Sequence, residues 1–174
     1  MLTVWHSPHP AWKPGENWPR EVPVVRYDTD DAVVLIDPFL PPDGVFDPGG
    51  KPVRVLHTAP WHTRGTRDFV DRFGATVAPD APGVEAIRPD GDPVETLFYI
   101  AAERTLVTGD VFSGTGGRFH VFFPDEIVDR EAYLRSLARL GDLPIERVIV
   151  AHGDEIPTAG AERIRAAVAE ARHG

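Results

Sequence analysis

Residues 53–65 read VRVLHTAPWHTRG, an apolar strand that runs directly into a polar loop. The apolar side chains of Val53–His57 predict a buried strand. The next residues, Thr66–Phe73, carry apolar side chains three and four positions apart, which predicts a short helix. Gly74 stands where a helix often ends in a left-handed residue. This unit indicates a functional site at a strand end, where the sheet holds the loop rigidly.

Two more polar loops follow predicted strands. Thr105–Thr108 runs into Gly109-Asp110, and Arg147–Val150 runs into Ala151-His152-Gly153. The remaining predicted elements are strands at residues 22–27, 32–36, 76–78, 84–87 and 94–100, and helices from a cap at Asp129 to about Leu140 and over Ala159–Arg172. Strands that come early, with strand–helix units after them, indicate sheets packed together with helices outside.

The first twenty residues hold three of the four tryptophans, Trp5, Trp12 and Trp18, among closely spaced prolines. Prolines at this density exclude a helix. We therefore expect residues 1–20 to form an extended arm that lays its aromatic rings on a single domain of residues 1–174. A functional alternative is that the arm roofs a pocket or meets a second subunit.

The composition excludes several classes of function. A net charge of −9 disfavours a nucleic-acid binder and a protein that docks on an anionic membrane, because both need basic surfaces. No apolar run approaches the roughly 20 residues that span a bilayer. No signal-peptide pattern opens the chain, so a cytoplasmic location is expected. With no cysteine, a metal could be bound only by histidine, carboxylate or water.

Four strand ends together resemble the metallo-β-lactamase superfamily. They are Val33–Asp37, the Val53–His57 strand with its loop, Leu106–Asp110 and Val148–Gly153. In this order they cover most of the chain, from residue 22 to residue 156. The resemblance implies an α+β fold, a four-layer αββα sandwich, with a hydrolase site where these strands end.

The chain departs from the family pattern in its first loop. There the family carries His-x-His-x-Asp-His, which binds two zinc ions. Aligned on Thr58, the four ligand positions hold Ala59, Trp61, Thr63 and Arg64. Alanine and tryptophan offer no lone pair, and arginine is a permanent cation. The family's next histidine would fall within Arg88–Val94, which contains none, so a two-zinc site is not expected.

The resemblance leaves Asp110 and His152 at family ligand positions. His62, one residue past a lost ligand, would complete a three-ligand set for one zinc, iron or manganese ion with a position open to water. Asp110, His152 and Arg64 are then the candidate catalytic residues.

Other residues of the cleft could contact a small-molecule substrate. We assign this role to Trp61, Arg64 and His120, the guanidinium of Arg64 being suited to an anionic group. His120 lies in the aromatic run Arg118–Phe123, for which a partly buried strand or a subunit contact is the simpler interpretation.

The loss of four ligands favours a metal-free site over a single metal. In that alternative the protein is a non-catalytic module that binds a small molecule or acts in regulation or assembly, with a homodimer as the simplest assembly. Arg64 would then replace the charge of the metal in an ion pair with Asp110. His57 is the other candidate for the third metal ligand, but it lies in phase with Val53 and Val55 in a strand, so a core histidine bonded to the backbone is the simpler interpretation.

Overall fold

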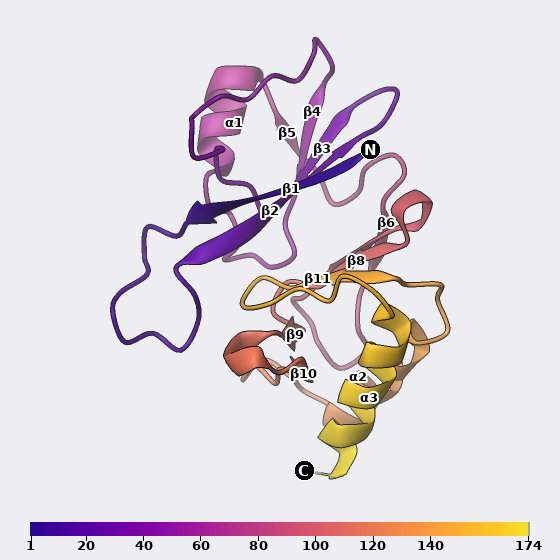
Figure 1. The fold of residues 1–174 in the computed structure, drawn as a ribbon. Coiled ribbons are helices and arrows are strands. Elements are labelled where there is room, and N and C mark those ends of the chain that lie inside the picture. Colours follow the sequence, from indigo (N-terminus) through magenta and orange to yellow (C-terminus); the bar gives the residue numbers. More distant parts are fainter. Residues whose placement is uncertain (174) are drawn as a thin grey trace.

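The computed structural model describes residues 1–173 and contains two main β-sheets that pack against each other (Figure 1). The first sheet has the strand order β1-β2-β3-β4-β5. Its strands are β1 (Leu2–Pro8), β2 (Glu21–Asp28), β3 (Val33–Ile36), β4 (Val53–Leu56) and β5 (Thr76–Val77). The β1–β2 and β2–β3 pairs are antiparallel and the other two pairs are parallel, so the sheet is mixed.

The second sheet has the strand order β11-β8-β7-β6. Its strands are β6 (Glu85–Ile87), β7 (Leu97–Ile100), β8 (Thr105–Val107) and β11 (Arg147–Ile149). A separate antiparallel pair is made of β9 (Phe112–Ser113) and β10 (His120–Val121). The helices are α1 (Thr66–Phe73), α2 (Arg130–Leu140) and α3 (Gly160–His173), with short 3-10 turns η1 (Ala101–Glu103) and η2 (Thr115–Gly117).

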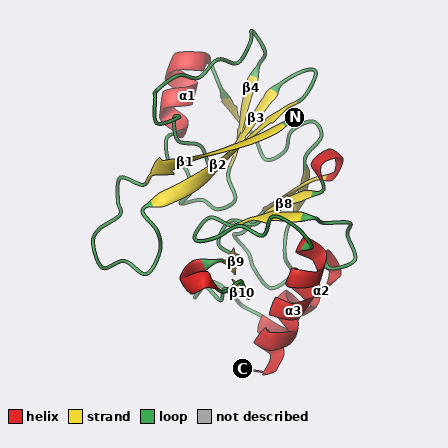
Figure 2. Ribbon diagram, in the orientation of Figure 1, coloured by secondary structure: helices red, strands yellow, loops and turns green. Residues whose placement is uncertain are grey.

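The helices and the two sheets form four layers (Figure 2), and three groups of buried side chains fill the spaces between these layers. Between the sheets, Val34 of β3 lies in one cluster with Phe98 of β7. The outer face of the first sheet packs on α1 through Phe69. The outer face of the second sheet packs on α2 and α3 through Leu137 and Ile164. The αββα sandwich predicted from the sequence is therefore confirmed.

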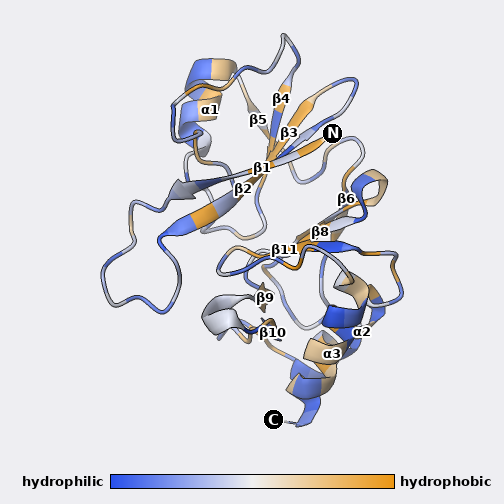
Figure 3. Cartoon of the chain, viewed as in Figure 1, coloured by the Kyte–Doolittle hydropathy of each residue, from blue (hydrophilic) through white to orange (hydrophobic). Residues whose placement is uncertain are grey.

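Strand β3 shows why central strands consist of consecutive apolar residues and do not alternate apolar with polar ones. All four of its residues are buried. Val33 and Leu35 belong to the cluster with α1, whereas Val34 and Ile36 belong to the cluster between the sheets. A strand covered on both faces has no solvent side for polar residues. Figure 3 shows the result as apolar colour on the strands and hydrophilic colour along much of the outer loops and helices.

The predicted helix ends are confirmed in detail. Helix α1 has the predicted bounds, and Gly74 follows it with φ 63°, in the left-handed region. Its backbone N–H donates to the carbonyl of Val70 at 3.1 Å. At the start of α2, the carboxylate of Asp129 accepts the N–H of Ala132 at 2.9 Å. Within residues 1–173 every helix is too short or too polar to span a bilayer.

Two predicted segments differ from the structure. Residues 2–8 of the expected extended arm form strand β1 and pair residue by residue with β2, so only residues 9–20 form a loop. Strand β7 begins at Leu97 and not at Val94. There the carboxylate of Asp92 accepts the N–H groups of Val94 and Glu95 at 2.9 and 3.0 Å, which holds this part of the chain in a turn.

Candidate metal centre

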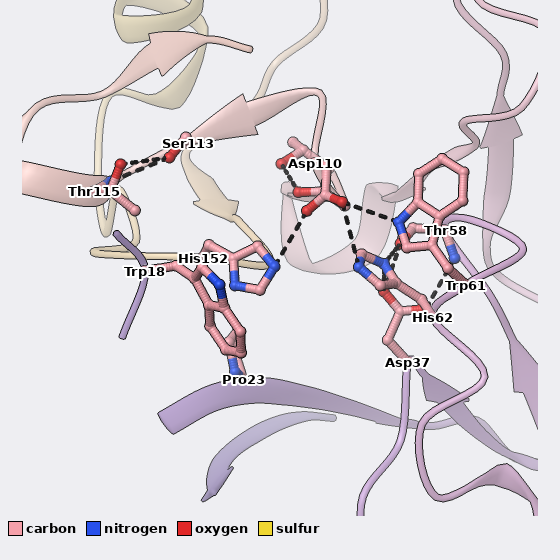
Figure 4. A network of polar contacts seen from close by, with 12 residues as sticks. Trp18, Pro23, Asp37, Thr58, Trp61, His62, Asp110, Ser113, Thr115 and His152 are labelled. Atoms are coloured by element: carbon pink, nitrogen blue, oxygen red, sulfur yellow. Dashed lines mark hydrogen bonds and ion pairs between the residues drawn. The ribbon is translucent and has the colours of Figure 1, made fainter. Parts of the chain in front are cut away.

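Three loops meet at one end of the sandwich, and each follows a strand. The loop after β4 carries His62, the turn after β8 carries Asp110, and the loop after β11 carries His152 (Figure 4). Strands β8 and β11 are parallel neighbours, so their carboxyl ends lie side by side. One ligand atom from each of the three side chains lies within 4.8 Å of the others. The three residues that the sequence indicated as a metal set thus lie together.

Asp110 is the centre of this group. Its Oδ2 lies 3.4 Å from Nε2 of His62, and its Oδ1 lies 3.5 Å from Nε2 of His152. The indole N–H of Trp61 donates to Oδ2 at 3.1 Å. One carboxylate oxygen is therefore restrained by the first loop, and the other faces His152.

His62 is oriented by a buried carboxylate behind it. Its Nδ1 lies 2.7 Å from Oγ1 of Thr58 and 3.2 Å from Oδ2 of Asp37. Asp37 also accepts the backbone N–H of Thr58 at 2.9 Å and its hydroxyl at 2.5 Å. Burial would raise the pKa of Asp37, but His62, Arg64 and the Thr58 hydroxyl together hold it below its ordinary value. A carboxylate behind a histidine is the arrangement that aims the other ring nitrogen at a metal.

The backbone is strained at two residues beside this network. Asp37 has φ 49° and Arg64 has φ 41°, values that residues other than glycine seldom adopt. The Nη1 of Arg64 donates to the carbonyl of Asp37 at 3.1 Å, so the two positions support each other. Strain of this kind persists where surrounding contacts enforce it, and it clusters at functional sites.

His152 is held by an aromatic contact. Its ring centroid lies 4.8 Å from that of Trp18, which belongs to the 9–20 loop. Burial, opposed in part by Asp110, lowers the pKa of His152 to about 4. The ring is thus neutral at physiological pH and keeps a lone pair, the form in which histidine binds metals.

These three residues fit one metal ion. Ligand atoms about 2.0–2.1 Å from a tetrahedral zinc lie roughly 3.3 Å from one another. The contacts of Asp110 with the two histidines, 3.4 and 3.5 Å, are made by its two different oxygens, and one ligand atom from each of the three residues lies within 4.8 Å of the others, so the group has to contract slightly around a zinc ion. Three protein ligands leave a fourth position open, as catalytic zinc sites require.

Sequence comparisons match the chain to no family model and to no curated protein. Comparison with solved structures does find proteins of similar fold. A metallo-β-lactamase superfamily protein from Sulfolobus tokodaii matches with a TM-score of 0.67 at 13% identity, over 97% of this chain and 85% of that one. A metallo-β-lactamase from Pontibacter korlensis matches with a TM-score of 0.66 at 16% identity, over 97% and 98%. FIM-1 of Pseudomonas aeruginosa, in a mono-zinc form, matches with a TM-score of 0.59 at 11% identity, over 98% and 91%.

The chain has a metallo-β-lactamase fold. Relative to the two-zinc pattern of proteins with that fold, the first loop cannot supply the usual ligands. Ala59 is buried and has no donor atom, while the side chains of Trp61 and Thr63 lie in exposed positions. A two-metal centre therefore does not fit these residues, whereas a one-metal centre does.

Arg64 does not form the ion pair with Asp110 that the sequence suggested. Its Nη1 donates instead to the carbonyls of Pro23 and Asp37, at 2.9 and 3.1 Å, and its guanidinium lies 5.8 Å from the ring centroid of Phe39. The first loop bends toward β2, which brings backbone oxygens closer to the guanidinium than the carboxylate of Asp110. Arg64 thus ties the loop to the first sheet, and its catalytic and substrate-binding roles remain predictions.

Glu95 is a buried residue of this region that the sequence did not single out. Its side chain is 1% exposed, and burial, with Asp110 and Asp92 nearby, raises the pKa of Glu95 to about 9. A Cβ at Gly109 would lie 2.8 Å from its Oε2 and 2.6 Å from Oγ1 of Thr58. Only glycine fits there, at φ 55°, so packing requires a glycine directly before Asp110. The sequence could not reveal Glu95, because a carboxyl group that is buried by a neighbouring loop leaves no periodic pattern.

The other predicted site residues surround the three candidate ligands. His120 lines a cavity together with Asp110 and His152 but lies outside the ligand set. Trp61 contacts Asp110 directly. His57 bonds to the hydroxyl of Thr66 at 2.7 Å, so the expected bond to the backbone is wrong.

Proposed function

We propose that the protein is a hydrolase with a single-metal site, in which His62, Asp110 and His152 hold one zinc, iron or manganese ion. The observation that carries this proposal is Oδ1 of Asp110, a buried oxygen that faces Nε2 of His152 and has no hydrogen-bond partner within residues 1–173. An unpaired buried oxygen costs about 1–3 kcal/mol, a cost that a cation bound to it would remove. When bound, the ion supplies a Lewis acid and lowers the pKa of a coordinated water.

The chain's own residues have distinct parts in this function. Asp37 and Thr58 orient the ring of His62 before any ion arrives. The N–H of Trp61 restrains one oxygen of Asp110. The indole of Trp18 covers one side of His152 and reduces the access of water to it. These contacts come from the chain itself, so they hold the three ligand residues in place whether or not an ion is bound.

A metal-free binding module is the second candidate, and the contacts of Asp110 favour it. Its Oδ2 already accepts a hydrogen bond from Trp61 and lies 3.4 Å from Nε2 of His62, so part of the carboxylate is satisfied without an ion. In this case the cavity beside Asp110 would bind a small molecule, and a homodimer would be the simplest regulatory assembly.

Metal content decides between the two candidates. The untagged protein is incubated with excess zinc, dialysed and measured by elemental analysis. About one zinc per chain is expected, and His152→Ala is expected to lose it. His120→Ala is the matched control, because His120 lines the same cavity outside the ligand set, and it should keep the zinc. Zinc content near zero in the unaltered chain would overturn the proposal and leave the metal-free module. Equal zinc in His152→Ala would overturn the ligand assignment.

A further inference from the structure

A cavity of about 300 Å³ opens directly beside the candidate metal centre. Asp110 and His152 form one part of its wall, and the rest comes from the 9–20 loop, β9, η2, β10 and Phe122, which directly follows β10. This volume is at the lower end of the range for small-molecule sites. The other wall residues therefore determine which compounds can place a hydrolysable bond beside the three ligand residues.

Aromatic rings make the apolar part of the wall. Trp18 is held in place by two contacts of its own loop: its Nε1 donates to Glu16 at 3.2 Å, and its carbonyl accepts the Nε1 of Trp12 at 2.9 Å. Phe112 is buried and stacks on Phe119 with 11° between the ring planes. A flat apolar group is the shape that such rigid rings accept best, because offset and edge contacts between rings are favourable.

Phe122 also favours the binding of a flat apolar group. It lines the same cavity and is 44% exposed. Covering exposed apolar surface gains roughly 25 cal/mol per Å². A ligand that lies across Phe122 would remove this ring from water, so the cavity favours compounds with an apolar face.

The polar part of the wall is uncharged apart from Asp110 and the histidines. Ser113 and Thr115 join their hydroxyls at 2.9 Å, and Asn17 contributes an amide. Within the described residues no lysine or arginine lines the cavity. Arg64, which the sequence suggested for an anionic group, uses its Nη1 on two backbone carbonyls and does not line this cavity. An anionic substituent would find no cationic side chain here.

A second cavity, of about 470 Å³, continues from the first and shares Asn17, Trp18 and Thr115 with it. Its wall carries three carboxylates, those of Glu16, Glu21 and Asp154, and no lysine or arginine among the described residues. A ligand long enough to pass Trp18 would therefore meet a negative field. Like charges at this range disfavour an anionic tail and favour a neutral or cationic one.

We propose that the cavity binds a compound that bears an aromatic or similarly flat apolar group and whose remaining substituents are neutral or cationic, with carboxylic esters as the probes that test it as a substrate site. The assignment as a substrate rests on the single-metal hydrolase proposed above. In hydrolysis the acyl–oxygen bond breaks, the hydroxyl of water joins the acyl carbon, and the proton goes to the leaving oxygen. Anionic substituents away from the reacting bond, such as a ring carboxylate, are disfavoured, since no lysine or arginine among the described residues lines either cavity.

The kinetic test compares three esters on the zinc-loaded protein: phenyl acetate, 4-acetoxybenzoate and 4-(trimethylammonio)phenyl acetate. Each kcat/KM is divided by the rate constant for hydrolysis by hydroxide, which removes the difference in leaving-group reactivity. The neutral and cationic esters are expected to exceed the carboxylate by about tenfold or more. Equal or reversed values would overturn the substrate class.

A binding test separates this inference from the hydrolase proposal. The metal-free protein is titrated with acetanilide, 4-acetamidobenzoate and 4-acetamido-N,N,N-trimethylanilinium, with tryptophan fluorescence as the signal. The same order of affinity is expected. Trp18→Ala should weaken acetanilide about tenfold. Glu21→Lys combined with Asp154→Lys, both exposed positions, should raise the relative affinity for 4-acetamidobenzoate.

The two tests fail in different ways. If zinc does not bind but the affinities keep their order, the hydrolase proposal is wrong and the cavity assignment stands. If zinc binds but the anionic probe binds as well as the others, the cavity assignment is wrong and the metal centre stands. Unchanged affinities in Trp18→Ala would also place the ligand outside this cavity and overturn the inference.

Discussion

The two histidines of the candidate metal centre are held in opposite ways. Nδ1 of His62 lies within bonding distance of Thr58 and Asp37, in a buried polar network. Nδ1 of His152 has no hydrogen-bond partner within residues 1–173, and the ring rests on the indole of Trp18. Polar contacts fix the rotation of a ring, whereas an aromatic contact fixes mainly its face. The His62 side is therefore preorganised, and the His152 side can adjust when an ion binds.

The largest expected effect is that of Asp37→Ala, which breaks the polar side. Asp37 is 4% exposed and accepts bonds from the N–H and hydroxyl of Thr58 and faces Nδ1 of His62. Removal of one partner from a buried network costs roughly 3–5 kcal/mol, and we expect that loss in the free energy of unfolding measured with urea. Asp125→Ala, at an exposed position, is the control and should change stability little. A loss below about 1 kcal/mol in Asp37→Ala would contradict the preorganised side.

Thr58→Val tests the same side at a smaller scale. It removes the hydroxyl between Asp37 and His62 while it nearly preserves shape and retains the backbone N–H that Asp37 accepts. Loss of a partner behind a metal ligand commonly weakens metal binding 10–100-fold. We expect a weakening in that range, measured by zinc titration against a competing chelator. Zinc affinity equal to that of the unaltered chain would show that the network does not orient His62.

Trp18→Ala tests the aromatic side and should affect metal binding less. Trp18 is half-buried on a loop, and its contact with His152 carries no hydrogen bond. An aromatic pair contributes about 0.5–1.5 kcal/mol beyond burial, so the zinc affinity should fall by less than about tenfold. The same chelator competition measures it. A loss larger than that of Thr58→Val would reverse the comparison between the two sides.

The smallest effect is expected from the ion pair of Arg26 and Asp28, which serves as a reference outside the site. Two hydrogen bonds of 2.8 Å from Arg26 lower the pKa of Asp28 below 3.8. The stabilisation is thus present above pH 3.8 and is lost as the pH falls through the lower folded value. We expect Asp28→Asn to cost less than about 1 kcal/mol at neutral pH and to match the unaltered chain near pH 2. A difference that grows on acidification would contradict this sign.

Local rules were enough to predict most of the fold. Gly74 and Asp129 end and begin helices through contacts within a few residues, so the sequence alone marks them. The prolines and tryptophans predicted an extended arm packed on the domain, but the pairing of residues 2–8 with β2 was not predicted, because strand pairing depends on a distant partner. The start of β7 was also wrong, since the carboxylate of Asp92 replaces strand hydrogen bonds with turn contacts.

The site was predictable only in part. His62, Asp110 and His152 lie together because each follows a strand whose end is fixed by the sheets. The support that Asp37 gives to His62 depends on side-chain directions between two loops, and no spacing reveals it. The packing of Trp18 on His152 likewise joins residues 134 positions apart in sequence. The expected ion pair of Arg64 with Asp110 was wrong, because a charge pattern cannot show that nearby backbone oxygens will bind the guanidinium instead.

The hydrogen bonds of Arg64 also affect how the first loop behaves when no metal ion is bound. Its guanidinium binds the backbone carbonyls of Pro23, in β2, and Asp37, directly after β3. A cation that belongs to the chain itself therefore anchors the first loop. A chelator or a shortage of metal can remove an ion but cannot remove a side chain. The loop should therefore keep its shape without an ion, and an ion that binds later should find the loop already folded.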